Sequence, residues 1–196
     1  KCALDPMYFI ENYVKIVSLD HGTVLFKMYP YQKSMLEGFV NNRFNICMLA
    51  RQMGKTTIVA AYLLHLICFT KDYQIGVLAN KGDTSREILS RLKLMFEQLP
   101  WFLKPGVREW NKGSIILGNG SKIVSSGTSS AGVRGISANL IYLDEFAHID
   151  NDVEFYESTY PVIASGETTR VIITSTPKGM NLFYKMWTDS VNGRNE

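Results

Sequence analysis

The chain has 196 residues, of which 46% are hydrophobic and 20% are charged, and its formal net charge is +3. This length allows one buried core, and these fractions are typical of a soluble α/β domain. The basic residues are scattered, so the charge permits an acidic partner such as DNA without requiring one.

Several classes of protein are not expected. No signal peptide is recognisable, and the apolar run Ile58–Phe69 is too short to span a bilayer and contains His65, so no membrane association is predicted. The three cysteines form no ligand-spaced pair, and the three histidines are too dispersed for a metal site. Because the chain begins at Lys1 without a methionine, we expect it to be part of a longer protein.

The first forty residues predict two helices separated by a hairpin. Asp5 and Pro6 suit the N-cap and the first position of a helix. The expected elements are a helix to about Val14, strands Lys15–Leu19 and Thr23–Met28, and a helix from about Tyr31 to Val40.

A phosphate-binding loop is predicted at residues 50–57, between the apolar run Phe44–Leu49, interpreted as a buried strand, and the helical pattern Lys55–Phe69. Backbone N–H groups and the positive end of the helix dipole suit such a loop to polyphosphate. Lys55 would reach the β- and γ-phosphates, and the Thr56 hydroxyl would ligate Mg²⁺. The first glycine of the general pattern is replaced by Leu49, so the loop alone also fits an ordinary strand-to-helix turn. The nucleotide-binding residues predicted here are Arg51, Gln52, Met53, Gly54, Lys55, Thr56 and Thr57.

Downstream of the loop, strands and helices alternate. This alternation implies a mostly parallel sheet with helices on both faces. The expected elements are the strand Gln74–Ala79, the amphipathic helix Ser85–Leu99, a hairpin of Ile115–Leu117 and Ile123–Ser125, the strand Leu140–Glu145, a helix near Val153–Ile163, the strand Arg170–Ser175 and a helix from about Leu182 to Val191.

Two carboxylates close the apolar run at 139–145, and they are the second half of the predicted site. Ligands bind beyond the carboxyl ends of the strands in open α/β sheets. Asp144 is therefore expected to hold Mg²⁺ through its water shell, and Glu145 to orient the attacking water. The pair by itself also fits a solvated strand end, but together with the Lys-Thr loop it indicates a nucleotide-hydrolysing site.

Other polar residues are candidates for the same site. Tyr31 and Gln32 lie just upstream of the first sheet strand, and a glutamine amide matches N6 and N7 of adenine, although a solvated glutamine is the alternative. Thr174, Ser175 and Thr176 end another strand, and their hydroxyls are expected to sense hydrolysis. The alternative is an ordinary strand end closed by a Pro-Lys-Gly turn. Arg51 in the loop, or Arg134 in a glycine-flanked segment, would supply a guanidinium to the transition state.

These motifs resemble those of the large terminase subunit, the DNA-packaging motor of tailed bacteriophages, and most closely its T-even-like group. Members of that family also lack the first glycine of the loop. The resemblance covers nearly the whole chain in family order. Its carriers are Tyr31-Gln32, residues 50–56, Glu109–Ser114, Val133–Gly135, Leu140–Glu145 and Thr174–Gly179.

The resemblance implies a RecA-like P-loop ATPase of the additional-catalytic-glutamate class, with ATP and Mg²⁺ as cofactors. It assigns the adenine motif to Gln32, the phosphate loop to Arg51–Thr56, the metal and water roles to Asp144 and Glu145, and coupling to Thr174–Thr176. The expected layout is one ATPase domain over 1–196, with a helix and hairpin in 1–29, a nucleotide-binding core in 30–180 and the start of a lid in 181–196. The family's C-terminal nuclease is not expected within these residues.

The implied partners are double-stranded DNA, the portal protein and the small terminase subunit. The implied assembly is a homo-oligomeric ring at the portal of an empty capsid in the cytoplasm of the infected bacterium, while this piece alone would be monomeric.

Two other functions remain open. A superfamily-two helicase shares the glutamine motif and the Asp-Glu strand end, but residues 144–147 read Asp-Glu-Phe-Ala and depart from the helicase pattern. A docking module that binds ATP only to assemble is the second. Duplex unwinding would favour the first, and an absence of hydrolysis the second.

Overall fold

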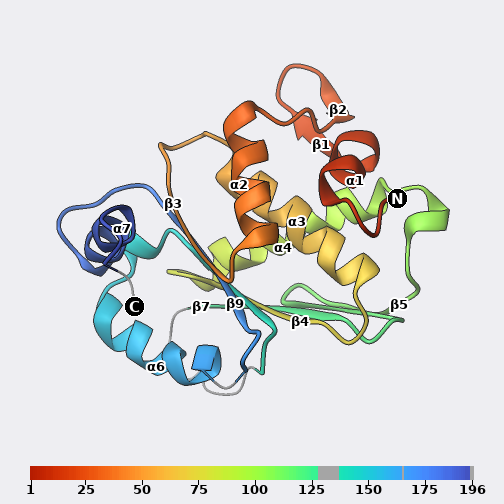
Figure 1. Ribbon diagram of the computed structural model, residues 1–196. Coiled ribbons are helices and arrows are strands. Elements are labelled where there is room, and N and C mark those ends of the chain that lie inside the picture. Colours follow the sequence, from red (N-terminus) through yellow and green to blue (C-terminus); the bar gives the residue numbers. More distant parts are fainter. Residues whose placement is uncertain (128–136, 165, 195–196) are drawn as a thin grey trace.

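The computed structural model describes residues 1–127, 137–164 and 166–194, and in it helices cover both faces of a central sheet (Figure 1). One face carries α1 (Pro6–Tyr13), α2 (Pro30–Asn41), α3 (Lys55–Phe69) and α4 (Gly82–Glu97), and the other carries α6 (Asp152–Ala164) and α7 (Leu182–Val191). The buried hydrophobic side chains accordingly form two clusters, a larger one with α1–α4 and a smaller one with α6 and α7.

The central sheet has seven strands in the order β3-β9-β8-β4-β7-β6-β5. The first five run parallel to one another, β6 pairs antiparallel with β7, and β5 pairs antiparallel with β6. The predicted mostly parallel α/β fold is therefore confirmed. The strands are β3 (Phe44–Met48), β4 (Gln74–Ala79), β5 (Val107–Trp110), β6 (Ser114–Leu117), β7 (Lys122–Gly127), β8 (Leu140–Asp144) and β9 (Arg170–Ser175).

The central strand β8 shows why a parallel strand is apolar throughout. All five of its residues are buried, because successive side chains enter opposite cores. Leu140 and Tyr142 belong to the larger cluster, whereas Ile141 and Leu143 belong to the smaller one. The apolar run therefore places Asp144 at the carboxyl end of a strand in the middle of the sheet.

The predicted N-terminal helices and hairpin form, although the second strand ends at Leu25 and not at Met28, and α1 and α2 pack beside α3. Asp5 caps α1 by accepting a hydrogen bond of 2.8 Å from the Tyr8 backbone N–H, and Pro6 occupies the first helical turn. The hairpin consists of β1 (Lys15–Ser18) and β2 (Gly22–Leu25), paired antiparallel in a separate two-stranded sheet.

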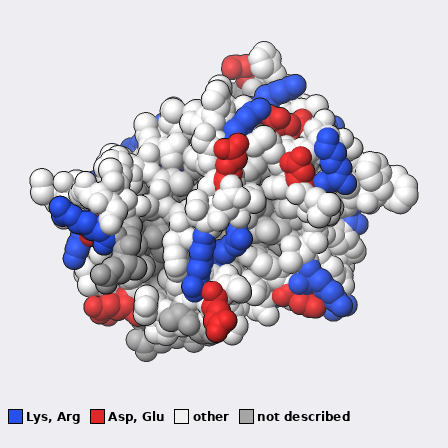
Figure 2. Space-filling model, in the orientation of Figure 1, with Lys and Arg blue, Asp and Glu red and all other residues white. Residues whose placement is uncertain are grey.

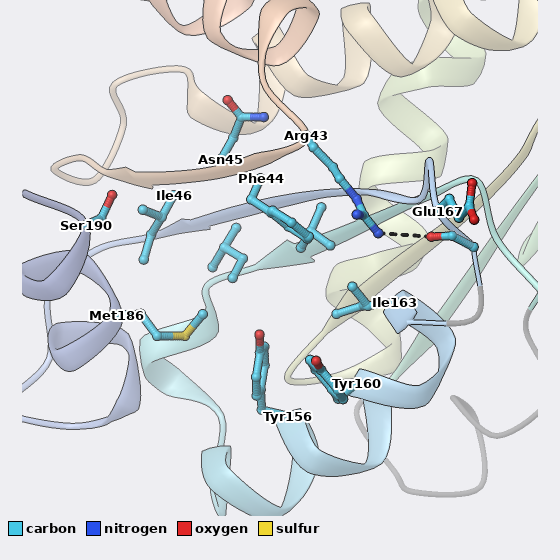
Figure 3. A pocket seen from close by; sticks show the side chains of 13 residues that line it. Arg43, Phe44, Asn45, Ile46, Tyr156, Tyr160, Ile163, Glu167, Met186 and Ser190 are labelled. Carbon is cyan, nitrogen blue, oxygen red and sulfur yellow. Dashed lines mark hydrogen bonds between the residues drawn. The ribbon is translucent and has the colours of Figure 1, made fainter. Parts of the chain in front are cut away.

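The prediction that the strand before the phosphate loop is buried is wrong. Among the described residues β3 pairs only with β9, and Phe44 and Met48 at its two ends are 58% and 39% exposed. An apolar run can thus lie at the edge of a sheet. Beside β3 is a groove of about 820 Å³, in which Phe44 and Ile46 face Met186 and the tyrosines of α6 (Figure 3).

Within the described residues, no helix is long and apolar enough to cross a membrane. On the face shown in Figure 2, Lys and Arg side chains are interspersed with Asp and Glu and form no continuous basic surface.

His65 in α3 predicts a measurable dependence of stability on pH. Its Nε2 lies 2.9 Å from the Cys2 carbonyl oxygen, its ring packs against Phe9 and Phe69, and its Nδ1 is buried with no hydrogen-bond partner among the described residues. Burial lowers the pKa of His65, and the Cys2 hydrogen bond and the charge of Asp5 oppose this only in part. The folded protein therefore binds this proton more weakly than the unfolded chain does.

The stability that neutral His65 contributes is expected to be complete above its unfolded pKa of about 6.5 and to be lost as pH falls through the lower folded pKa. His65→Gln should consequently show a smaller fall in Tm between about pH 7.5 and about pH 5.5 than the unmodified protein shows. His21→Gln, at an exposed hairpin residue, is the control and should leave that fall unchanged. Equal falls in all three proteins would contradict the assignment.

Candidate nucleotide-binding site

The carboxyl ends of β3, β9, β8 and β4 lie side by side, and the predicted site residues gather there. The loop after β3 ends at Gly54, whose φ of 68° lies in the left-handed region that favours glycine. A Cβ at this position would stand 2.7 Å from Nε2 of Gln32, so any side chain here would displace that amide. Lys55 then begins α3 directly, with its side chain buried.

Lys55 and Glu145 meet at the centre of this edge. The Lys55 Nζ lies 2.7 Å from Glu145 Oε1, and the two side chains are 8% and 28% exposed. The other oxygen, Oε2, accepts hydrogen bonds of 3.0 Å from both the backbone N–H and the hydroxyl of Thr176. Burial alone would raise the pKa of Glu145, but the Lys55 and Thr176 contacts outweigh it and lower that pKa, so the carboxylate is held ionised.

The backbone of Glu145 is unusual as well. Its φ of 51° places a residue other than glycine in the left-handed region, directly after β8 and before the short 3₁₀ helix η2 (Phe146–His148). Such conformations cost free energy and persist only where the surroundings enforce them, which occurs most often at functional sites. The turn directs the carboxylate back over the strand ends, where Lys55 and Thr176 bind it.

Asp144 is held by a buried hydroxyl network. Its Oδ1 accepts hydrogen bonds from the Tyr142 hydroxyl at 2.7 Å and from the Thr174 hydroxyl at 3.0 Å. The side chain of Thr56 interacts with the same Tyr142 hydroxyl, so the two predicted metal ligands lie around one group. Burial raises the pKa of Asp144, and the two hydroxyls only partly offset this.

These residues fit a bound Mg²⁺. A carboxylate that is 3% exposed pays for its burial in free energy, and a divalent cation next to it would relieve that cost. Carboxylate and hydroxyl oxygens are also the ligands that Mg²⁺ prefers. Thr56 and Asp144 would hold the ion together with phosphate oxygens, and the ion would neutralise charge on the phosphates.

Thr174 and Ser175 end β9, Thr176 follows it, and all three hydroxyls bind groups of the site. The Thr174 hydroxyl binds Asp144, and Thr176 binds Glu145. The Ser175 hydroxyl accepts a hydrogen bond of 3.0 Å from the Ala147 N–H and donates one of 2.8 Å to the Thr176 carbonyl oxygen. The predicted coupling segment is thus in direct contact with both acidic residues, while its coupling role stays a prediction.

Tyr31 and Gln32 contact the phosphate loop from α2. The Tyr31 hydroxyl donates to the Met53 carbonyl oxygen at 2.7 Å, and Gln32 Nε2 donates to the Gly54 carbonyl oxygen at 3.3 Å. Gln32 Oε1 accepts from the Tyr29 N–H at 3.0 Å, and the residue is 2% exposed. Both ends of the Gln32 amide therefore form hydrogen bonds with backbone groups. These bonds support the loop, and the sequence did not predict that role. Reading of adenine by Gln32 stays a prediction.

A cleft of about 260 Å³ opens beside Glu145 and contains further residues. Arg51 and Thr176 line it, while the action of Arg51 on the phosphates stays a prediction. Sequence reasoning missed the remaining lining residues, which are Asn80, Lys81, Thr84 and His148. Asn80 follows β4 as Glu145 follows β8, and this shared position at a strand end was the signal available. Of the other predicted residues, Gln52 and Thr57 lie in or directly after the loop, and Arg134 lies outside the described residues.

Comparison with known proteins places this geometry in a family. Residues 46–196 match the family described as terminase large subunit, T4likevirus-type, N-terminal. The fold is similar to that of the large terminase of bacteriophage HK97, with a TM-score of 0.81 and 20% identity over 98% of this chain and 42% of that one. It is also similar to the ATPase domain of the Thermus phage P74-26 large terminase, with a TM-score of 0.71 and 20% identity over 82% of this chain and 69% of that one.

A third similar structure contains a nucleotide. The large terminase of a thermophilic bacteriophage, solved in complex with ATP-gamma-S, matches with a TM-score of 0.67 and 15% identity over 86% of this chain and 43% of that one. The present chain thus spans less than half of the HK97 protein and of this third protein. At these identities the structures show the fold, and the family match over three quarters of the sequence identifies the lineage. The chain belongs to the terminase large subunit family, of the type found in T4-like viruses.

Proposed function

We propose that this chain binds ATP with Mg²⁺ and hydrolyses it. The observation that carries the proposal is the contact of 2.7 Å between Lys55, the first residue of α3, and Glu145, the residue after β8. It joins the group suited to bind the β- and γ-phosphates to the group suited to orient water at the γ-phosphorus. A docking module that only binds nucleotide would need the lysine but not the glutamate.

The Lys55 ammonium would leave Glu145 for the phosphates when ATP enters. Glu145 would keep its contacts to Thr176 through Oε2, and Oε1 would become available to a water molecule. The water oxygen then bonds to the γ-phosphorus as the bond from that phosphorus to the β–γ bridging oxygen breaks. Glu145 accepts the proton of the water, and ADP and inorganic phosphate are released. Arg51, at the cleft beside Glu145, would neutralise charge in the transition state.

The hydrolysis test is phosphate release measured in the purified protein with ATP and increasing Mg²⁺. Turnover should require the metal and should disappear when a chelator removes it. Turnover that persists in chelator would contradict the metal role of Thr56 and Asp144, and an absence of turnover with ATP bound would favour the docking module.

We further infer that hydrolysis drives double-stranded DNA into a viral prohead. Membership of the terminase large subunit family supports this, as does the similarity to a structure described as the Phi-28 gp11 DNA packaging motor, with a TM-score of 0.56, 12% identity and 80% of this chain covered. In this proposal the protein acts as a ring at the portal in the infected cell, together with the small terminase subunit. Packaging of duplex DNA into purified proheads is the decisive assay, whereas strand separation would favour a helicase.

Gln32→Ala is expected to weaken ATP binding and to reduce the preference for ATP over GTP. The first effect follows from loss of the Gly54 contact that supports the loop. The second follows because a site that hydrogen-bonds a base discriminates against analogues that leave its own groups unpaired. Competition binding with ATP and GTP measures both. Equal losses for the two nucleotides would leave Gln32 with the supporting role alone, and Ser34→Ala on exposed α2 surface is the control.

Arg134 is proposed to act on the nucleotide of a neighbouring subunit, with Arg51 acting in its own site. The proposal rests on the sequence alone: Arg134 stands in the motif Gly-Val-Arg-Gly, and arginines that act in trans are common in phosphoryl transfer. In a mixed assembly, Arg134→Ala subunits should recover part of their activity from Lys55→Ala subunits, because each supplies what the other lacks. Recovery no greater than dilution predicts would show that Arg134 acts within its own subunit or only structurally.

A further inference from the structure

His148 ends the short helix η2 and links three strand ends around the cleft. Its Nε2 lies 2.8 Å from the Thr176 hydroxyl oxygen, after β9. Its backbone carbonyl oxygen accepts a hydrogen bond of 2.8 Å from the side chain of Asn80, after β4. Its ring is 3.8 Å from Glu145 Oε2, too far for a direct hydrogen bond to the residue after β8. A hydrogen-bonded path from the His148 ring to the Glu145 carboxylate therefore runs through the Thr176 hydroxyl.

The direction of these hydrogen bonds follows from counting protons. An ionised carboxylate only accepts, so the single proton of the Thr176 hydroxyl is donated to Glu145 Oε2 across 3.0 Å. The hydroxyl oxygen must then accept from His148, whose Nε2 carries the proton. This reasoning gives a one-way chain from His148 through Thr176 to Glu145, and it assigns the Nε2–H form to the imidazole.

We propose that His148 is a positioning residue for Glu145, acting by fixing the rotation of the Thr176 hydroxyl. The hydroxyl in turn holds Oε2, so that Oε1 alone is presented to water once Lys55 has moved to the phosphates. The inference rests on the proposed function, because it concerns the same glutamate. His148 touches neither nucleotide nor water in this scheme, and its removal should slow turnover without weakening nucleotide binding.

The surroundings of η2 allow the side chain to be tested without disturbing the loop. The Ala147 N–H is bound by Ser175, its carbonyl oxygen is bound by Asn181, and the His148 carbonyl oxygen is bound by Asn80. These contacts hold the backbone whatever side chain stands at position 148. The side chain of His148 is 26% exposed, so the cleft leaves room for a substitute.

Four variants separate positioning from a structural role. His148→Phe keeps a flat ring but removes the donor, and kcat should fall about fivefold to tenfold, as expected for one hydrogen bond, with ATP affinity and Tm unchanged. His148→Gln places an amide nitrogen near Nε2 and should keep most of the activity. His148→Asn, whose amide is too short to reach Thr176, should lose it as His148→Phe does. His21→Phe, in the exposed hairpin, is the control for the ring substitution.

A double-mutant cycle tests the route through Thr176. Thr176→Val removes the hydroxyl and should lower kcat, and adding His148→Phe should lower it no further, because the chain is already broken. Multiplied losses in the double variant would overturn the proposal. Weakened ATP binding in His148→Phe would also overturn it, as would an equal kcat in His148→Gln and His148→Asn. If His148→Phe does not fold, the comparison of His148→Gln with His148→Asn tests the proposal by itself.

The same experiment distinguishes this inference from the proposed function. If the unmodified protein hydrolyses ATP and Glu145→Gln does not, while His148→Phe retains full kcat, the positioning role is wrong and the ATPase assignment stands. If the unmodified protein binds ATP but does not hydrolyse it in any assembly, both are wrong.

Discussion

Replacing Lys55 by alanine is expected to abolish ATP binding together with turnover. Among the described residues, Lys55 is the one cation buried at the N-terminus of α3. Its side chain is 8% exposed, and its ammonium lies over the strand ends. In the proposed function it contacts the β- and γ-phosphates in the ground state as well as in the transition state. Removing one member of such a buried charged contact typically costs about 2–5 kcal/mol, so ATP affinity should fall by about thirtyfold to several thousandfold.

Binding of a fluorescent ATP analogue measures this loss independently of hydrolysis. Lys33→Ala is a matched control, because Lys33 also makes an ion pair of 2.7 Å, with Glu11, but its side chain is 39% exposed on α2. That variant should bind ATP normally, since exposed ion pairs contribute little. Circular dichroism should show both variants folded. If folded Lys55→Ala binds the ATP analogue with unchanged affinity, the assignment of residues 50–57 as a phosphate-binding loop is wrong.

The elements around the site were predictable because their signals are local. The bounds predicted for α3, β4, β9 and α7 agree with the structure, since buried runs and the Gly-Lys junction mark them plainly. In contrast, β5 was missed. Its four residues, Val-Arg-Glu-Trp, alternate in no clear way and are only partly buried or exposed, because the strand lies at the far edge of the sheet. A weakly buried edge strand leaves little pattern in a sequence.

The edge position of β3 was not predictable for a related reason. The sequence Phe-Asn-Ile-Cys-Met is apolar enough for a central strand, but strand order depends on contacts between segments far apart in the chain. Nothing local indicates that β9, more than a hundred residues later, pairs with β3 on one side. Phe44 and Ile46 instead line the groove shared with α6 and α7, whereas Cys47 packs against the larger core cluster.

The same limit separates the predicted site residues from those that were missed. Lys55, Asp144 and Glu145 belong to contiguous motifs whose chemistry is legible one segment at a time. The contact of Thr174 with Asp144 depends on the register of β8 with β9, which pairs these two residues. Asn80 reaches His148 only because β4 is the other neighbour of β8. Partners of this kind follow from the topology and not from the motifs.

Glu145→Gln is expected to separate binding from hydrolysis. The amide keeps the shape of the side chain and can still accept a hydrogen bond from Thr176, but it cannot take a proton from water. Loss of such a general base typically lowers the rate by about a hundredfold or more. Mg²⁺ binding should be retained, because Thr56 and Asp144 are unchanged.

The same variant should bind ATP at least as tightly as the unmodified protein. In the structure the Lys55 ammonium is paired with Glu145 at 2.7 Å, so the carboxylate competes with the phosphates for it. A neutral amide weakens that competition, which opposes the effect of Lys55→Ala. Single-turnover hydrolysis and binding of the same ATP analogue measure the two quantities, with Glu87→Gln on exposed α4 surface as the control. Hydrolysis retained in Glu145→Gln would place the base on another residue, and ATP binding lost with it would mean that Glu145 supports the site and does not orient water.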